Sequence, residues 1–467
     1  MWAKLRHQLW QWRGVLIAAP SVAGLVIGLR WAGWLQGLEL IALDQLFQVR
    51  PNEPMDSRVV IVEINEADIQ KVGQWPISDE KLAQLLTILK QQKPRAIGLD
   101  LYRDLPVEPG HQELVNVFKS TPNLIGIQKV VENNPGFVSP PSILKELGQV
   151  GANDLLTDSD GKVRRSLFSL KDKSGETIPS LGTLLALIYL ETEGITLQEI
   201  DASKQKYRLG KAIFTPFDRN DGGYVRADVG GYQIVSNFRN LRQGFPPISM
   251  TDVLEGRIPT DLMRDRIVLI GLTGESVRDD FYTPYNHGLV GQLARSFAGV
   301  ELHADLASQI VSAALEGRPL IKVWSEPVEW LWIFSWSVVG ATLSWVQRYH
   351  NGVTQRFLLK AGSIVLVGGS LIGGSYLAFV QGLWIPLVPG VLGLAGSAIA
   401  ITFYVAHTAT RMRQTFGRYL TDEVVTSLLE TPDGLQVGSE KRKVTILMSD
   451  LRGFSALSER IPAETAV

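Results

Sequence analysis

The sequence predicts an α/β fold, a mixed sheet covered by helices, joined to four transmembrane α-helices. Strand-like runs such as "RVVIVEI" (58–64) alternate with helix-like runs such as "KLAQLLTILKQQ" (81–92). Four long apolar stretches flank that region, one near the N-terminus and three after residue 326. Mean hydropathy is slightly positive, +0.08, although 20% of the residues are charged. Such an average is typical of a soluble region attached to membrane spans.

Length and composition limit the possible function classes. With 467 residues the chain is too long for one ordinary core, so we expect at least two units. A net charge of -1 argues against nucleic acid as a partner, because binding phosphates needs a basic surface. The chain has no Cys, which excludes disulfides, thiolate metal sites and thiol nucleophiles. Its six His show no spacing typical of zinc ligands.

Residues 14–34 are expected to form the first transmembrane helix, after a cytoplasmic N-terminus of residues 1–13. The apolar run "GVLIAAPSVAGLVIGL" lies between Arg13 and Arg30, and two Trp follow where amphipathic rings suit a membrane interface. The stretch "IAAPSVA" resembles a signal-peptidase site, so a cleaved signal is the competing interpretation. Because the apolar run continues beyond that point, we favour an uncleaved anchor.

Three further transmembrane helices are expected at residues 327–347, 358–380 and 384–407. Each has about the length needed to cross a hydrocarbon core of ~30 Å. Buried helices of a soluble core are rejected as an alternative, because no polar face recurs at helical spacing. Within 358–380, Gly369-x-x-x-Gly373 favours close contact with another helix, although this motif alone is a weak signal.

Basic residues predict the orientation of these spans. They precede the first span, lie between the second and the third, and follow the fourth, whereas the turn between the third and the fourth carries no charge. All these basic clusters fall on one side if the spans alternate, and the positive side is cytoplasmic. We therefore expect a multi-pass protein surrounded by the lipid of a bacterial inner (plasma) membrane. Both termini would be cytoplasmic, and residues 35–326 would lie outside.

The exported region opens with a βαβ unit. Its parts are the runs at 58–64 and 81–92 and the apolar strand "RAIGLDLY" (95–102). Further strands are expected at "NLIGIQ", "YQIVSNF" and "RIVLIGL", and further helices at "IPSLGTLLALIYLE" and "GVELHADLASQIVSAALEG". The pattern predicts a sheet covered by helices.

Few residues in the exported region suggest a site. Asp158, Asp160 and Gly161 in "TDSDGKVRRS" hint at a calcium loop, but the acidic residue required at the twelfth position is missing. Because Asp-Gly is a strong turn signal, we favour a plain β-turn there, and another turn at "DRNDGGY" (218–224). His303, on an amphipathic helix, is interpreted as a packed or surface histidine rather than a ligand. No nucleophile elbow or acid–base pair is recognisable, so these residues predict binding or sensing.

The same region resembles a known family. The blocks that carry the resemblance follow one another as "LDQLFQVRP", "VVIVEINEADI", "GQWPISDEKLAQLL", "PRAIGLDLY", "DSDGKVRRS", "FPPISMTDVLEG", "RDRIVLIG", "FYTPY" and "GVELHADL". Their order over roughly residues 38–320 is similar to the second class of CHASE domains, extracellular sensors attached to bacterial cyclases and histidine kinases. The resemblance implies sensing of an unknown signal, and three membrane helices usually follow such a domain.

Residues 408–442 are expected to form a cytoplasmic transducing linker. Thr421 is a plausible N-cap, because Asp422 and Glu423 would then lie in the first turn. The apolar face of this helix would consist of Val424, Val425, Leu428 and Leu429. A simple tether and a joint that passes a signal inward both remain open, and in a homodimer the apolar face would pair with its copy.

The closing residues 443–467 contain "VTILMSDLRGFSALSER", which resembles the first strand and turn of class III nucleotide cyclases. That resemblance implies the start of a ferredoxin-like catalytic domain that converts ATP to cyclic AMP and pyrophosphate. It also implies an active site shared by two copies. ATP and GTP cannot be told apart, because the base-selecting residues of such domains would lie beyond Val467.

The resemblance assigns roles to five residues of the closing stretch. Asp450 and the backbone carbonyl of Leu451 would bind Mg or Mn ions, and the backbone amides of Arg452, Gly453 and Phe454 would approach the phosphates. The second metal carboxylate would lie beyond the sequence, so no catalytic site is complete and we expect the chain alone to be inactive. Whether it belongs to an enzyme stays open. The alternative is a non-catalytic membrane receptor that acts through a cytoplasmic partner.

Overall fold

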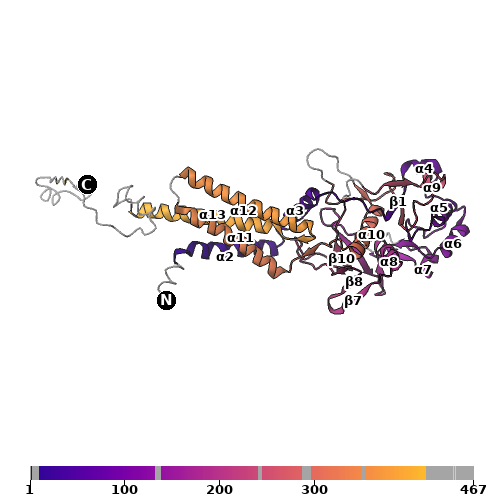
Figure 1. Ribbon diagram of the computed structural model, residues 1–467, viewed down its shortest axis with the longest axis horizontal. Helices are drawn as coiled ribbons and strands as arrows, with labels where there is room; N and C mark the ends of the chain where they lie inside the picture. The colour runs from indigo at the N-terminus through magenta and orange to yellow at the C-terminus, as the bar shows by residue number, and fades with distance from the viewer. Residues whose placement is uncertain are drawn as a thin grey trace, which may run out of the picture. The chain divides into compact units, whose positions relative to one another are not determined.

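The computed structural model describes residue 2, residues 10–131, 138–239, 244–286, 296–349 and 353–416, and residues 445 and 448. The chain divides into two units, Met1–Tyr404 and Val405–Val467. The first unit contains the α/β domain and most of the long apolar helices (Figure 1). Of the second unit, the structure describes chiefly the end of the last helix, which continues to Phe416.

A six-stranded parallel sheet forms the centre of the α/β domain. Its strands are β11 (Pro247–Ser249), β1 (Val59–Ile64), β12 (Ile267–Leu272), β2 (Ala96–Asp100), β3 (Leu124–Gln128) and β4 (Val150–Ala152), in this spatial order. The register of the central pair runs from Val59 opposite Ile267 to Ile64 opposite Leu272. The predicted α/β class is confirmed. The main sheet is parallel rather than mixed, because its strands are joined through helices while antiparallel pairs form separate small sheets.

Helices cover both faces of this sheet. One face carries α4 (Glu66–Val72), α5 (Asp79–Gln91), α6 (His111–Lys119), α7 (Ser142–Glu146) and α9 (Met250–Leu254), and the other carries α8 (Leu181–Glu191) and α10 (Gly299–Glu316). Side chains of a strand alternate between the faces. Accordingly Val60 and Val62 pack with the first group, and Val59 and Ile61 with the second.

Smaller sheets complete the domain. They are β10 (Tyr232–Val235), β5 (Arg165–Lys171) and β6 (Thr177–Pro179); β7 (Gln198–Asp201), β8 (Lys206–Leu209) and β9 (Ala212–Phe214), with the short helix η1 (Ala202–Lys204); and β13 (Asp280–Phe281) with β14 (Phe297–Ala298). The predicted strands and helices are thus present. The strand in "YQIVSNF" is β10, which pairs with β5 outside the main sheet.

Long helices form a bundle beside the domain. They are α2 (Arg13–Trp31), α11 (Glu326–Val346), α12 (Val353–Val380) and α13 (Leu387–Phe416), with the short helix η2 (Gln347–Tyr349) after α11. α11 runs antiparallel to α2, because Glu329 pairs with Arg30 at one end and Trp345 donates to the Gln11 carbonyl at the other, at 2.9 Å. Between α2 and the sheet lies α3 (Gln36–Val49), a helix that the sequence analysis did not predict.

The prediction of four apolar spans requires a correction. Among the described residues, three helical segments are long and apolar enough to cross a membrane: Arg13–Trp31, Ala361–Val380 and Leu387–Thr408. The fourth predicted span, 327–347, forms α11 but is not among them. α11 carries two glutamates and several serines, and Glu329, Ser337 and Ser344 are buried in the first unit instead of adding apolar surface.

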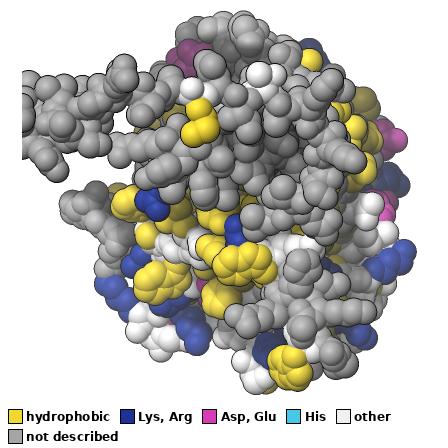
Figure 2. Space-filling view, turned by 90° about the vertical axis from the view of Figure 1, so that its left-hand side faces the viewer, with side chains coloured by type: hydrophobic (Ala, Val, Ile, Leu, Met, Phe, Trp, Pro, Cys, Tyr) yellow, Lys and Arg dark blue, Asp and Glu magenta, His cyan; other side chains and the backbone are white. Residues whose placement is uncertain are grey.

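The bundle exposes large apolar side chains. Leu16, Ile17 and Leu25 of α2 are more than half exposed, and so are Val365 and Leu366 of α12. Figure 2 shows apolar side chains at the surface, with Lys and Arg near them. Exposure of this kind on long helices is typical of a surface covered by lipid.

Candidate functional site

Helix α3 connects the bundle to the α/β domain and carries buried charges. The chain turns at Gly33, whose φ of +85° favours glycine, and α3 begins at Gln36. Glu39 and Asp44 are each only 2% exposed. Buried carboxylates are rare unless partners satisfy them. Each has partners in a different part of the chain, and we call this set of contacts the α3 junction.

Asp44 is held by two basic residues of the "DSDGKVRRS" segment. The Arg164 side chain is fully buried and donates from Nε to Asp44 Oδ1 at 2.7 Å and from Nη2 to Oδ2 at 2.9 Å. Lys162 adds a contact from Nζ to Asp44 Oδ2 at 2.6 Å. A bidentate arginine–carboxylate pair of this kind fixes the orientation of the two side chains as well as the distance between them. The junction therefore joins α3 rigidly to the segment before β5.

Arg164 also binds the two acidic residues of the preceding turn. It donates to Asp158 Oδ2 at 2.8 Å and to Asp160 Oδ2 at 2.6 Å. The predicted β-turn is confirmed, since the Gly161 N–H donates to the Asp158 carbonyl at 2.8 Å. The carboxylates that suggested a calcium loop are thus bound by arginine, an arrangement that does not fit a calcium site.

Electrostatics stabilise the charged form of this cluster. Burial acts to lower the pKa of Arg164, but hydrogen bonds to Asp44 and Asp160 outweigh it and raise that pKa. Burial likewise acts to raise the pKa of Asp160, but the Arg164 guanidinium lowers it below the usual range. The ion pairs therefore persist at neutral pH, although desolvation of each member opposes them.

The second predicted turn, 218–224, lies against the first. Its turn structure is confirmed by donation from the Asp221 N–H to the Asp218 carbonyl at 3.0 Å. Tyr224 at its end is 2% exposed and donates its hydroxyl to Asp158 Oδ2 at 2.7 Å. The Arg165 guanidinium lies 4.7 Å from the Tyr224 ring centroid, a cation–π distance. Two segments that the sequence suggested only as turns thus form one buried cluster.

Glu39, on the same helix, contacts the start of α13. Its Oε1 accepts from the Leu387 N–H at 2.9 Å and its Oε2 from the Val388 N–H at 2.8 Å. Burial raises the pKa of Glu39, and these two backbone N–H groups oppose that effect. The first N–H groups of a helix lack partners within it and favour negative charge, so Glu39 caps α13 from another element.

Further contacts tie the bundle to the turn at 218–224. Arg30, at the end of α2, is buried, pairs with Glu329 and donates to the Gly222 carbonyl at 2.6 Å. β15 (Lys322–Val323), which precedes α11, pairs in parallel with β16 (Leu383–Trp384), which precedes α13. The connection between α12 and α13 is thereby attached to the end of the α/β domain.

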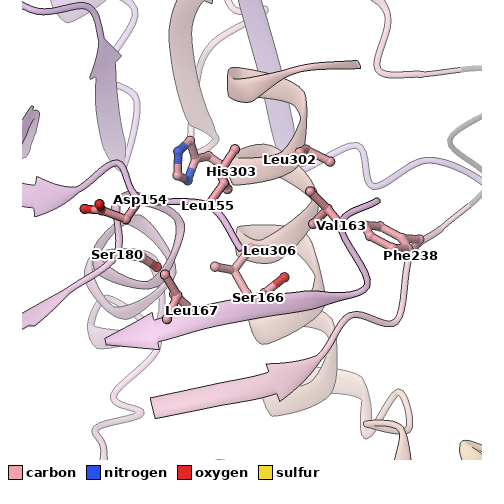
Figure 3. Close-up of a pocket in the computed structure, with 10 residues that line it drawn as sticks. All are labelled: Asp154, Leu155, Val163, Ser166, Leu167, Ser180, Phe238, Leu302, His303 and Leu306. Carbon is pink, nitrogen blue, oxygen red and sulfur yellow. The ribbon is translucent and has the colours of Figure 1, made fainter. Parts of the chain in front are cut away.

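A cavity beside α10 provides a second place to consider. Figure 3 shows Leu302, His303 and Leu306 of α10 opposite Ser166 and Leu167 of β5. The enclosed space measures about 10 Å³, room for about one water molecule. An organic ligand needs far more space, so this cavity does not suit one.

His303 is a packed histidine, as predicted. It is 1% exposed, and its Nε2 lies 2.7 Å from Asn153 Oδ1. Burial, followed by the charge of Lys129, lowers the pKa of His303 to about 4, so its ring is neutral at pH 7. Among the described residues no group of three or more His, Asp or Glu side chains is placed to hold a metal ion.

The residues assigned by resemblance to the cyclase lie outside the described part of the chain. These are Asp450, Leu451, Arg452, Gly453 and Phe454, and the predicted linker helix from Thr421 to Leu429 lies outside it too. Conversely, Glu39, Asp44 and Arg164 were not predicted from the sequence as site residues. Their signal was faint: Asp44 and Arg164 lie within quoted family blocks, and Glu39 is an acidic residue in an apolar run.

The chemistry of the α3 junction is suited to mechanical coupling. Its carboxylates are engaged by arginine, lysine or backbone N–H groups, so the described residues of the junction contain no acid–base pair arranged for catalysis. What it can do is hold three distant segments in one geometry. A displacement of the turns must then either move α3 or break buried ion pairs, which is costly.

Comparison with protein families identifies the region that carries this junction. The model of the CHASE2 domain matches residues 22–342, a wider range than the 38–320 of the resemblance. Comparison with curated proteins and with solved structures finds no match. The matched range includes α3, the parallel sheet and both turns of the junction. The chain therefore belongs to the CHASE2 family, whose domain is an extracellular sensor of signalling receptors.

Proposed function

We propose that the chain is a transmembrane receptor that couples an extracytoplasmic stimulus to a cytoplasmic class III cyclase. The observation that carries the receptor function is the α3 junction, whose buried charges link the sensor domain to α13. The buried Arg30 adds a link from the sensor domain to α2 and α11. A sensor that only bound its stimulus would not require such a connection to apolar helices. The cyclase output rests on the resemblance of residues 443–467.

The proposed topology follows from the helices. In this proposal α2 carries the chain out through the membrane. α11 is antiparallel to α2 and crosses back beside it, although it is less apolar than the three candidate spans, so the sensor domain lies at one end of this pair. The basic residues near both chain ends favour a cytoplasmic location for them. The protein would belong to a bacterial inner membrane, with the sensor domain outside.

The proposed output uses the closing residues. Asp450 and the Leu451 carbonyl would hold Mg or Mn ions, which supply charge neutralisation at the phosphate under attack. The amides of Arg452, Gly453 and Phe454 would bind the triphosphate of ATP. Because class III sites are shared between two domains, the receptor would act as a homodimer. Crosslinking in membranes should then trap a dimer, and a strictly monomeric chain at high membrane density would contradict this part.

Reporter fusions test the topology. A reporter joined after residue 200 should be active only outside the cytoplasm, and one joined after residue 410 only inside it. The two positions lie in the sensor domain and in α13. A cytoplasmic signal from residue 200 would overturn the receptor proposal, because the sensor could then not face an outside stimulus.

Cyclase assays test the output. The 467-residue chain should form no cyclic nucleotide, whereas a chain extended by the rest of a class III domain should do so with Mg or Mn. In the extended chain Asp450→Asn keeps size and polarity but removes the charge, so activity should fall by several orders of magnitude. Near-normal activity of that variant would remove the assignment of Asp450. An inactive extended chain with the expected topology would favour the non-catalytic receptor.

A further inference from the structure

The first turn of α13 has few hydrogen-bond donors. A helix begins with four N–H groups that have no partner within it. In α13 these positions are Pro386, Leu387, Val388 and Pro389, and proline has no N–H. The two remaining N–H groups both donate to Glu39, at 2.9 and 2.8 Å. One carboxylate of α3 therefore caps the whole helix end.

We propose that α3 is a lever that transmits the state of the sensor domain to α13, with the Glu39 carboxylate as its contact point. The inference deepens the receptor function proposed above and rests on it, because α13 is the last apolar helix before residues 417–467. In this proposal the stimulus regulates the cap of α13. When α3 shifts, the Leu387 and Val388 N–H groups lose their hydrogen bonds to Glu39.

The position of the two carboxylates on α3 suits a lever. Glu39 and Asp44 are five residues apart, hence roughly 140° around the helix axis and about 7.5 Å along it. They therefore point to different partners. Arg164 of the sensor domain donates hydrogen bonds to Asp44, and backbone N–H groups of α13 donate to Glu39. A short, regular helix joins these two binding points, so a movement of Asp44 is passed to Glu39 with little bending of the helix.

Close packing at Glu39 gives a second route from the sensor. A Cβ atom on Gly223 would lie 2.6 Å from Glu39 Cγ, and one on Gly222 would lie 2.4 Å from Trp384 Cε3. Only glycine allows the 218–224 turn to lie so near to α3 and to the residues before α13. Movement of this turn must therefore displace Glu39 or Trp384.

Hydrogen exchange of the full chain in lipid nanodiscs tests the cap. In Glu39→Ala the amides of Leu387 and Val388 should exchange about tenfold faster or more, because a lost cap weakens a helix end by about that factor. Glu39→Gln retains one side-chain acceptor and should show a smaller increase. Amides of β1 and β12 should be unchanged, which separates local loss of the cap from unfolding.

Gln36→Ala is the matched control. Gln36 also lies on α3 and its side chain accepts from the Val225 backbone N–H at 2.9 Å, but within the described part of the chain it makes no hydrogen bond to α13. Its loss should speed exchange at Val225 and leave Leu387 and Val388 protected. If Gln36→Ala exposes α13 as much as Glu39→Ala does, Glu39 is not the contact point.

Asp44→Asn tests the lever itself, because among the described residues the Asp44 side chain bonds to Lys162 and Arg164 and not to α13. The substitution weakens the ion pairs of Arg164 and Lys162 with residue 44. Hydrogen exchange at Leu387 and Val388 should therefore rise severalfold. Should this variant fold poorly, Asp160→Asn weakens the same cluster from its exposed side. In either variant, faster exchange in the 158–165 segment with unchanged α13 amides would overturn the lever. These readouts need no catalysis, so an inactive cyclase extension would refute the output without affecting them.

Discussion

The parallel sheet and the α3 junction are both buried, but they are held together in different ways. Between β1, β12 and β2 the buried side chains are aliphatic, and they belong to strands whose neighbours are fixed by backbone hydrogen bonds. In the junction the buried charges belong to α3 and to the 158–165 segment, and they also bind the Tyr224 hydroxyl and backbone N–H groups of α13. Aliphatic contacts are interchangeable, whereas a buried charge depends on each partner. The sheet is therefore suited to stability, and the junction to a response that depends on geometry.

Of these substitutions, removal of Arg164 should lower the free energy of unfolding most. Arg164→Met leaves Asp44 and Asp158 buried without their main partner, which should lower the free energy of unfolding by about 3–5 kcal/mol. Thermal unfolding of the detergent-solubilised chain measures this. Loss of less than about 1 kcal/mol would mean that the junction is not held by its charges.

A cavity in the sheet should lower the free energy of unfolding somewhat less. Leu269 of β12 is fully buried, and Leu269→Ala should cost about 2–4 kcal/mol. This loss should be independent of pH between 5 and 8, because the substitution removes no titratable group. A strong pH dependence would show that sheet and junction are coupled, which would weaken the distinction drawn between them.

Asp100 offers a titratable test at the end of β2. Burial, and then the charge of Asp279, raise the pKa of Asp100 from 3.8 to about 7. A folded-state pKa above the unfolded value favours folding at low pH, and this contribution is lost as pH rises from about 4 to about 7. Asp100→Asn should thus be more stable than the natural chain at pH 8, by roughly 1–3 kcal/mol, since partial exposure reduces the effect.

The difference between Asp100→Asn and the natural chain should shrink when unfolding is measured at pH 4. A difference that grows on acidification would show that the Asp100 carboxylate is paired rather than isolated. Such a result would mean that an ion pair stabilises the end of β2. The sheet would then also depend on paired charges, as the junction does.

Surface ion pairs should have the smallest effect on stability. Glu255 pairs with Lys71 and with Arg257, and all three side chains are more than a third exposed. Glu255→Gln should change the free energy of unfolding by less than about 0.5 kcal/mol, because water already solvates these charges. A change above 1 kcal/mol would show that charge–charge contacts stabilise this protein generally, so that the junction would not be special.

Local patterns predicted most of the α/β fold. The runs at 58–64, 81–92 and 95–102 became β1, α5 and β2. A strand buried on both faces is a continuous apolar run, and a helix with one buried face has apolar residues at helical spacing. The count of apolar spans was less accurate, since α11 buries serine and glutamate against other helices. The role of Asp450 and the other closing residues stays a prediction.

By itself, the sequence determined most of the elements, the two turns and the presence of apolar helices, because each of these depends on residues close together in the chain. Only the tertiary structure decided which charges meet. Asp44 and Arg164 are 120 positions apart, and Glu39 and Leu387 are 348 apart. Such pairs leave no periodic signal in the chain. Their contact requires the sheet, both turns and α3 to be in place, since only the assembled fold removes the water that would otherwise solvate each charge.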